Sequence, residues 1–441
     1  MSFPRYPAYK DSGIPWVELI PSSWNVLPLC AVAKECDEPN HGMQENNLLS
    51  LSYGRIVQKD INSNDGLLPE SFETYQIVQP NDIVLRLTDL QNDQRSLRSA
   101  LVEQTGIITS AYLAVRPQEV APRFLSHLLR AYDATKVFYS MGGGLRQSMK
   151  FADLKRLPVV LPPMEEQPLI ATFLDHETAK IDALVAEQER LIELLKEKRQ
   201  AVISHAVTKG LDPSAPMKDS GVEWLGEVPA HWGVVRLKHL VDESVAGPYG
   251  ASLTKAMYSE SGYRVYGQQQ VIADDFSIGD YFISEEKYAE MRRYTVYEGD
   301  VLVSVMGTIG KVAVVTADAE PGIINPRLVR YRCNGLVKPR FLQRVLMCEK
   351  HQEHLSLESN GTTMEGLNMV TLGKVPVPTP PLNEQKQILS YLSERDSEFH
   401  PLIDEAAKAI ELLQERRTTL ISAAVTGQID VRGWIPTETA H

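Results

Sequence analysis

Two kinds of hydrophobic pattern alternate along the chain. Short apolar runs bounded by Gly, Asn and Pro fill residues 25–155 and 233–373, and they predict buried strands that end in turns. Each region is followed by a long stretch in which apolar residues recur every three or four positions, which predicts a helix of about 40 residues. The pattern therefore predicts an α/β (α+β) protein in which a globular domain and a long helix occur twice.

The second half of the chain repeats the first. In both halves K-D-S-G introduces two tryptophans eight residues apart, which are Trp16 and Trp24, then Trp224 and Trp232. The motif P-P-x-x-E-Q, at 162–167, returns at 380–385 and opens each long helix. Because the copies keep the same order, the chain is a tandem duplication of roughly 1–212 and 213–430 with an internal pseudo-two-fold.

The long helices carry a coiled-coil pattern over about four heptads. One alternative is that each helix packs on its own domain. An antiparallel pair is favoured, because it would place the globular domains at opposite ends and bring Glu177 toward Arg416. The expected helix-pairing residues are Leu174, Ile181, Leu184, Leu191, Leu195, Val202, Leu392, Phe399, Leu402, Leu413 and Leu420.

This organisation divides the chain into four regions. We expect a first globular domain at 1–155 and a central helix at 156–212. A second globular domain follows at 213–373, and a C-terminal helix at 374–441.

Charge and composition limit the class of protein. The chain has 441 residues with 45 Lys+Arg and 57 Asp+Glu, a net charge of −12, which alone argues against a nucleic-acid partner. The negative charge is densest on the helices, however, and 25–150 and 233–373 are close to neutral. The chain has no long apolar run, no secretion signal at its start and no C-x-x-C spacing, so we expect a cytoplasmic protein without membrane contact.

Catalytic motifs are missing from the sequence. The segment 307–311 resembles a phosphate-binding loop but lacks its first Gly and its Ser/Thr, and 351–354 does not match a zinc-binding helix. Neither a G-x-S-x-G elbow nor a dinucleotide-binding turn is present. The chain is therefore not expected to be an enzyme by itself, and no catalytic or metal-binding residue is assigned.

Polar and aromatic clusters occur in both globular domains. Arg can pair with guanine and Gln with adenine through two hydrogen bonds, and glycines let a loop approach a phosphate backbone. For any single residue a solvated loop is the alternative, but the set on two duplicated domains favours base recognition. The candidate DNA-binding residues are Tyr53, Arg55, Arg86, Thr88, Gln91, Arg95, Arg146, Gln147, Tyr266, Gln268, Gln269, Gln270, Ser304, Thr308, Lys311, Thr362 and Thr363.

Taken together, these features resemble the specificity subunit of type I restriction-modification systems. The resemblance rests on two variable domains, each introduced by D-S-G-x-x-W and P-x-x-W and followed by P-P-x-x-E-Q and a long helix, and it covers residues 9–430. The matches at 219–229 and 380–385 are close. The first half departs at Pro15 and Glu18, where the second has Glu223 and Gly226.

The resemblance implies a role for each part. The globular domains would be target recognition domains, each reading one half of a split site in double-stranded DNA. The conserved helices would form an antiparallel coiled coil that spaces the half-sites and binds two modification (methyltransferase) subunits. Restriction subunits with translocase and nuclease activity would join them. S-adenosylmethionine, ATP and Mg²⁺ would belong to these partners, and this chain would hold no cofactor.

Two other classes stay open at this point. One is a coiled-coil scaffold that binds only proteins, and the other is an enzyme fused to its own recognition domain. The sequence also leaves open the DNA target, its spacer, and whether a restriction subunit is present at all.

Overall fold

The computed structural model describes residues 3–62, 69, 71–88, 97–141, 149–360 and 367–436. The chain divides into two compact units. Unit 1 contains Met1–Glu189 and Ala407–His441, and unit 2 contains Arg190–Ala406. Each unit therefore combines one globular domain with parts of both long helices.

The globular domain of unit 1 is built around an antiparallel four-stranded sheet of order β4-β11-β8-β9. Its first long helix, α4 (Glu166–Lys209), begins in unit 1 and ends in unit 2. The other elements are β1 (Tyr9–Ile14), β2 (Val17–Pro21), β3 (Asn25–Pro28), η1 (Leu29–Ala31), β4 (Ala33–Cys36), β5 (Leu49–Ser52), β6 (Arg55–Gln58), β7 (Gln76–Val78), β8 (Ile83–Leu85), β9 (Ser99–Leu101), β10 (Gly106–Ile108), β11 (Leu113–Pro117), α1 (Pro122–Ala134), α2 (Val137–Met141), α3 (Phe151–Leu154) and β12 (Pro158–Leu161).

The globular domain of unit 2 repeats this plan with the sheet order β16-β22-β19-β20. The second long helix, α10 (Leu382–Val425), begins in unit 2 and ends in unit 1. The other elements are β13 (Met217–Asp219), β14 (Glu227–Pro229), β15 (Gly233–Arg236), η2 (Leu237–His239), β16 (Val241–Ala246), η3 (Gly250–Ser252), η4 (Lys255–Met257), β17 (Tyr263–Tyr266), α5 (Gln268–Ala273), β18 (Phe282–Ile283), α6 (Glu285–Glu290), η5 (Arg292–Tyr294), β19 (Val301–Ser304), β20 (Val312–Val314), β21 (Gly322–Ile324), β22 (Leu328–Cys333), α7 (Pro339–Met347), α8 (Glu349–Asn360), α9 (Met369–Lys374) and β23 (Pro376–Thr379).

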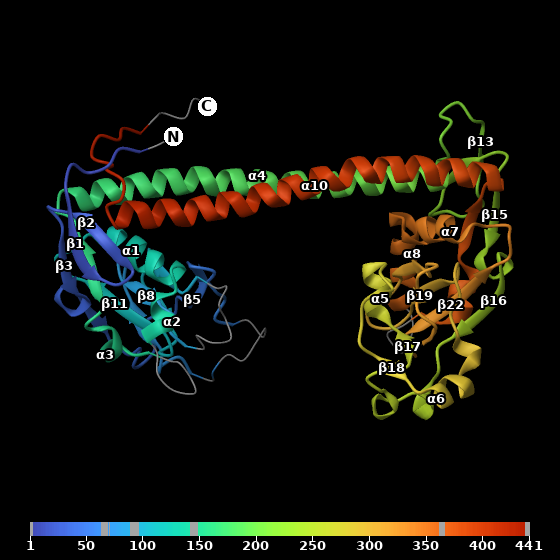
Figure 1. Ribbon diagram of the computed structural model, residues 1–441, viewed down its shortest axis with the longest axis horizontal. Coiled ribbons are helices and arrows are strands. Elements are labelled where there is room, and N and C mark those ends of the chain that lie inside the picture. Colours follow the sequence, from blue (N-terminus) through green and yellow to red (C-terminus); the bar gives the residue numbers. More distant parts are fainter. Residues whose placement is uncertain are drawn as a thin grey trace. The chain divides into compact units, whose positions relative to one another are not determined.

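The helix that follows each central sheet is built alike in both units. A proline stands in the first turn of α1 and of α7, where its missing N–H has no helical partner to lose. Each helix then buries one apolar face, which fits its amphipathic pattern. Figure 1 shows α1 between the sheet of unit 1 and the two long helices. The buried residues of these faces are Phe124, Leu125, Leu128 and Leu129 in α1, and Phe341, Leu342, Val345 and Leu346 in α7.

The long helices run antiparallel in both units. In unit 1 Arg417 Nε donates to Asp182 Oδ1 at 2.9 Å, and in unit 2 Arg199 Nε donates to Asp396 Oδ1 at 2.7 Å. Positions late in α10 thus meet positions early in α4, and the reverse holds in unit 2. The sequence predicted that Glu177 would approach Arg416, but the ion pair forms between Asp182 and Arg417, and Glu177 contacts His176 and Lys180 instead.

The spacing of the inward positions differs from the predicted one. Leu184, Leu191 and Leu402 are 51%, 43% and 48% exposed, so the prediction that they pair the helices is wrong. The other predicted pairing residues are buried or half-buried. The inward positions alternate by four and three, and they are Leu174, Thr178, Ile181, Val185, Gln188, Ile192, Leu195 and Arg199 in α4, and Leu392, Asp396, Phe399, Ile403, Ala406, Ile410, Leu413 and Arg417 in α10.

The physical reason is that both spacings offer apolar residues. Leu184 is followed by Val185, and Leu191 by Ile192. The sequence of one helix alone does not decide which of the two neighbouring residues faces the partner helix. The partner helix decides, because the ion pairs between Arg199 and Asp396 and between Arg417 and Asp182 fix which side of each helix faces the other.

The two repeated motifs contact each other in each unit. Trp24 Nε1 donates to Glu166 Oε2 at 3.2 Å, and Trp232 Nε1 donates to Glu384 Oε1 at 3.0 Å. Both tryptophans are buried. The P-x-x-W and P-P-x-x-E-Q motifs therefore form one structural joint, which fixes the start of each long helix against its globular domain.

The glutamine of each E-Q pair completes this joint. Gln167 accepts a hydrogen bond from the backbone N–H of Ala121, just before α1, at 2.7 Å. Gln385 accepts the corresponding bond from Lys338, just before α7, at 2.8 Å. Buried polar groups need hydrogen-bond partners. The Glu and Gln of each P-P-x-x-E-Q motif therefore have a structural role.

Candidate nucleic-acid interface

In unit 1 the predicted segment Tyr53-Gly54-Arg55 forms the tip of a hairpin. Strands β5 and β6 pair antiparallel, and Tyr53 and Gly54 between them have φ angles of 45° and 75°, as expected for a two-residue turn of type I′. Gly54 is required by packing, since a Cβ there would lie 2.7 Å from Leu97 Cβ. Tyr53 is 80% exposed and the Arg55 side chain 76% exposed, so the hairpin presents both side chains.

The predicted residues Arg86 and Thr88 follow strand β8 and are half-buried. Arg98, which is fully buried, holds this segment by donating from Nη1 to the carbonyls of Arg86 at 3.2 Å and Thr88 at 2.8 Å. The sequence did not identify Arg98, because a buried arginine within a polar stretch looks like a solvated one. Four predicted residues lie outside the described part of the chain, namely Gln91, Arg95, Arg146 and Gln147.

In unit 2 several predicted residues meet around Gln268, at the start of α5. Its Nε2 donates to Ser304 Oγ at 2.7 Å and to the carbonyl of Thr308 at 3.2 Å. It also contacts the carbonyl of Met306. Arg327 Nη1 donates to Gln268 Oε1 at 3.2 Å, so one amide joins α5 to the turn after β19 and to the segment before β22.

Three of the predicted contacts have a supporting role instead. Tyr266, Ser304 and Gln270 are 0%, 0% and 3% exposed. Gln270 Oε1 accepts from the backbone N–H of Gly267, and the Tyr266 hydroxyl donates to the Glu320 carbonyl. A side chain without exposed surface cannot touch a base in this conformation, so the prediction of direct contact is wrong for these three residues.

The remaining predicted residues of unit 2 lie near the surface. Gln269 and Thr308 are exposed and Lys311 is half-buried, whereas Thr362 and Thr363 fall outside the described residues. The exposed Arg327 was missed, because nothing in the sequence separates it from other surface arginines. Its backbone N–H is fixed by Asn325 Oδ1 at 2.9 Å.

One exposed and one half-buried tyrosine accompany this cluster. Tyr281 is 53% exposed, and its ring centroid lies 5.0 Å from that of Tyr258. Burial and the neighbouring Tyr281 raise the pKa of Tyr258, and the positive charge of Arg327 opposes that shift. The surface thus combines amide, guanidinium and aromatic groups, the groups that contact base edges and sugar–phosphate in protein–DNA interfaces.

Other chemistry finds little support in the described ranges. No group of three or more His, Cys, Asp or Glu there is arranged to hold a metal ion, and no helix there is long and apolar enough to cross a membrane. Cys348 Sγ lies 3.2 Å from His351 Nδ1. Burial raises the pKa of the Cys348 thiol and lowers that of His351 to about 4, so the pair is neutral at pH 7 and lacks the thiolate that a nucleophile needs.

Comparison with known proteins shows what the chain is similar to. A family model described as the type I restriction modification DNA specificity domain matches residues 231–411. The chain is similar to the type I restriction enzyme MjaVIII specificity subunit of Methanocaldococcus jannaschii, with 24% identity over 371 residues that cover 81% of each protein. It is also similar to the EcoBI specificity subunit of Escherichia coli, with 23% identity over 375 residues that cover 82% of this chain and 76% of the relative.

A solved structure supports the same fold. It is described as the structural basis of complex assembly and conformational transition of the type I R-M system. The match covers 93% of this chain and 99% of that chain, with a TM-score of 0.69 and 17% sequence identity.

Proposed function

We propose that the chain is a specificity subunit of a type I restriction-modification system, like the relatives to which it is similar, and that it selects the DNA sequence on which such a system acts. The observation that carries the proposal is the repeated sheet, β4-β11-β8-β9 in unit 1 and β16-β22-β19-β20 in unit 2. A duplicated recognition fold lets one chain act as a dimer does on DNA. Each globular domain is then a target recognition domain for one half of a split site in double-stranded DNA.

The two half-sites are expected to differ in sequence. In unit 1 the exposed hairpin offers Tyr53 and Arg55, whereas the corresponding surface of unit 2 offers Gln269, Thr308 and Arg327. Arginine forks suit guanine and amides suit adenine. A different set of donors and acceptors in each domain supports a target that is not a palindrome.

The long helices support a role as spacer and scaffold. Exposed leucines remain on them after pairing, including Leu184 and Leu412 in unit 1 and Leu191 and Leu402 in unit 2. Apolar surface of this kind is typical of a protein-binding site. We propose that two modification subunits bind there and supply the S-adenosylmethionine-dependent methyltransferase chemistry. Restriction subunits would add the ATP- and Mg²⁺-dependent steps, so this chain takes no catalytic part and acts where they do, in the cytoplasm.

The test is to map the methylated sites. The full-length chain is expressed with the modification subunit of its system in a host without other adenine methylation, and modified positions are sequenced. We expect one bipartite sequence with a fixed gap. Exchange of residues 25–155 for those of a relative should change one half-site, and exchange of 233–373, as the matched control, should change the other. Methylation that is independent of the chain, or a single exchange that alters both halves, would contradict the proposal.

A further inference from the structure

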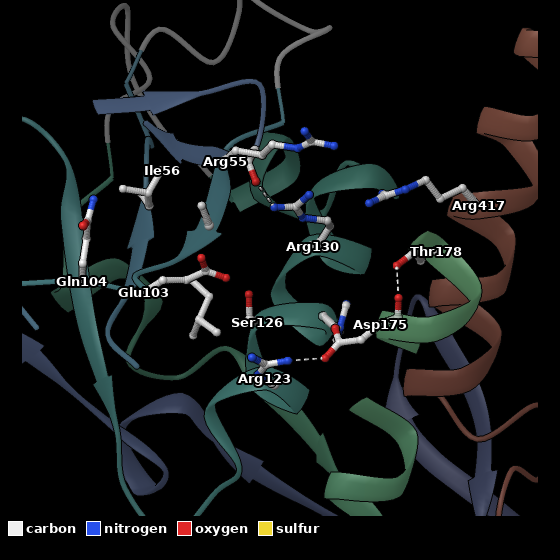
Figure 2. Close-up of a pocket in the computed structure, with 14 residues that line it drawn as sticks. Arg55, Ile56, Glu103, Gln104, Arg123, Ser126, Arg130, Asp175, Thr178 and Arg417 are labelled. Carbon is white, nitrogen blue, oxygen red and sulfur yellow. Dashed lines mark hydrogen bonds and ion pairs between the residues drawn. The ribbon is translucent and has the colours of Figure 1, made fainter. Parts of the chain in front are cut away.

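Three arginines from separate parts of the chain converge in unit 1. Arg55 comes from β6, Arg130 from α1 and Arg417 from α10, and all three line a cavity of about 690 Å³. Figure 2 shows the Arg55 and Arg417 side chains extending toward each other, with Arg130 close to both and its guanidinium directed at the backbone of the hairpin. We call these three residues the arginine cluster.

Carboxylates compensate the arginine cluster only in part. Asp182 accepts from Arg417 Nε at 2.9 Å, and its Oδ2 lies 3.6 Å from Arg55 Nη2. Arg130 Nη2 instead donates to two neutral carbonyls, of Ser99 at 2.6 Å and of Gly54. Within the described ranges, the three guanidinium groups therefore share one directly paired carboxylate, that of Asp182.

The environment of Arg130 reflects this excess of positive charge. Burial, together with the positive charges of Arg417 and Arg55, lowers the pKa of Arg130 to about 10, although Asp133 and Asp182 oppose the shift. Asp133 is itself buried, and burial raises its pKa. An anion placed between the three arginines would relieve this repulsion.

The rest of the cavity contains its own ion pair and a further carboxylate. Asp175 accepts from Arg123 Nη1 at 2.6 Å and lies 2.9 Å from His127 Nε2. Figure 2 shows the Arg123–Asp175 pair apart from the arginine cluster. Glu103 and Gln104, next to β9, also line the cavity. The arginine cluster thus lies at the end of the cavity next to the Tyr53–Arg55 hairpin.

Unit 2 shows that helix pairing does not require this cluster. The counterpart of Arg417 in the duplication is Arg199, which shares Asp396 with Arg344 at 2.7 Å and 2.6 Å. The counterpart of Arg130 is Met347, at the equivalent position of α7. In unit 2 the helices therefore pair through a carboxylate that binds two arginines. An arginine at the position of Arg130 occurs in unit 1 but not at its counterpart in unit 2.

We propose that the arginine cluster binds a backbone phosphate of the DNA next to the half-site read by unit 1. The inference rests on the proposed function and adds one contact to it. Guanidinium forks match phosphate oxygens in charge and geometry. The exposed Tyr53–Arg55 hairpin borders the cavity, so a duplex held by this hairpin brings its backbone to the arginines. Phosphate contacts of this kind fix the register of a protein on DNA without reading sequence.

The test measures affinity against salt concentration for the full-length chain in complex with its modification subunits. Wild type, Arg417→Gln, Arg55→Gln and the control Arg199→Gln are compared on target and non-target duplexes. We expect Arg417→Gln to weaken binding about tenfold on both duplexes. Arg55→Gln should weaken binding on both duplexes too, and more on the target if Arg55 also contacts a base. The slope of log affinity against log salt is negative, and its magnitude should decrease by about 0.9 when the phosphate contact is lost. Arg199→Gln should leave the slope unchanged.

A second measurement identifies the phosphate itself. Single methylphosphonate groups are placed along the half-site of unit 1, and one position should weaken wild type but not Arg417→Gln. If no position shows this coupling, or if the variants lose modification subunits while their salt slope stays that of wild type, the phosphate contact is refuted. The second result would assign the cluster to a partner carboxylate. Failure of the proposed function looks different, because wild type would then not distinguish target from non-target DNA.

Discussion

Removing the Glu166 carboxylate should destabilise unit 1 selectively. Glu166 is 6% exposed, and it accepts from Trp24 Nε1 at 3.2 Å and from the Tyr6 hydroxyl at 3.0 Å. Glu166→Ala leaves both buried donors without an acceptor. A buried donor without a partner costs about 1–3 kcal/mol, so the change should lower the free energy of unfolding of unit 1 by about 2–6 kcal/mol. Glu166→Gln keeps one acceptor oxygen but loses the charge, and it should cost about 1–3 kcal/mol.

The second copy of the motif provides the matched control. Glu384 accepts from Trp232 Nε1 at 3.0 Å and lies 2.8 Å from His231 Nε2, but its side chain is 23% exposed. Water can replace part of what is lost, so Glu384→Gln should cost less, and only in unit 2.

The assay must separate the units, because two compact units need not unfold together. Denaturant-dependent hydrogen exchange gives the free energy of opening for amides of each unit. A loss below about 1 kcal/mol for Glu166→Ala, or an equal loss in the amides of unit 2, would show that the Trp–Glu joint does not hold unit 1 together.

Three further outcomes are expected. Asp396 lies between Arg199 and Arg344, and although burial raises its pKa, these arginines outweigh burial and hold it below the usual value. A carboxyl whose pKa is lower in the folded state stabilises the fold above its unfolded pKa, near 4, and this stabilisation is lost as pH falls. Asp396→Asn should therefore flatten the decline of thermal stability below about pH 4. An unchanged decline would contradict the ion pair. Val185→Asp should destabilise unit 1 by about 2–4 kcal/mol and Leu184→Asp by under about 0.5 kcal/mol in chemical unfolding, with the reverse order favouring the predicted spacing. Inserting one heptad after Arg190 and one after Ala406 lengthens the helix pair by about 10 Å. The gap between methylated half-sites should widen by about 3 base pairs. An unchanged gap would refute the spacer role.

The duplication and its motifs could be predicted from the sequence, because both halves retain the residues of one structural joint. Trp24 and Glu166 lie far apart in the chain, yet the pair recurs as Trp232 and Glu384, and a repeated buried contact leaves a repeated pattern. The long helices and the mixed α/β plan followed from periodicity for the same reason, since each element buries one face regularly.

The depth of side chains and the meeting of distant ones were decided only by the tertiary structure. Tyr266 and Gln269 stand in one polar segment, but the first is buried and the second exposed, because the packing of β17 and α5 sets which side faces the core. Leu184 and Val185 are equally apolar, and only the opposite helix selects Val185. Arg55, Arg130 and Arg417 form a cluster because β6, α1 and α10 fold together, and local sequence contains no signal for a contact among three residues so far apart.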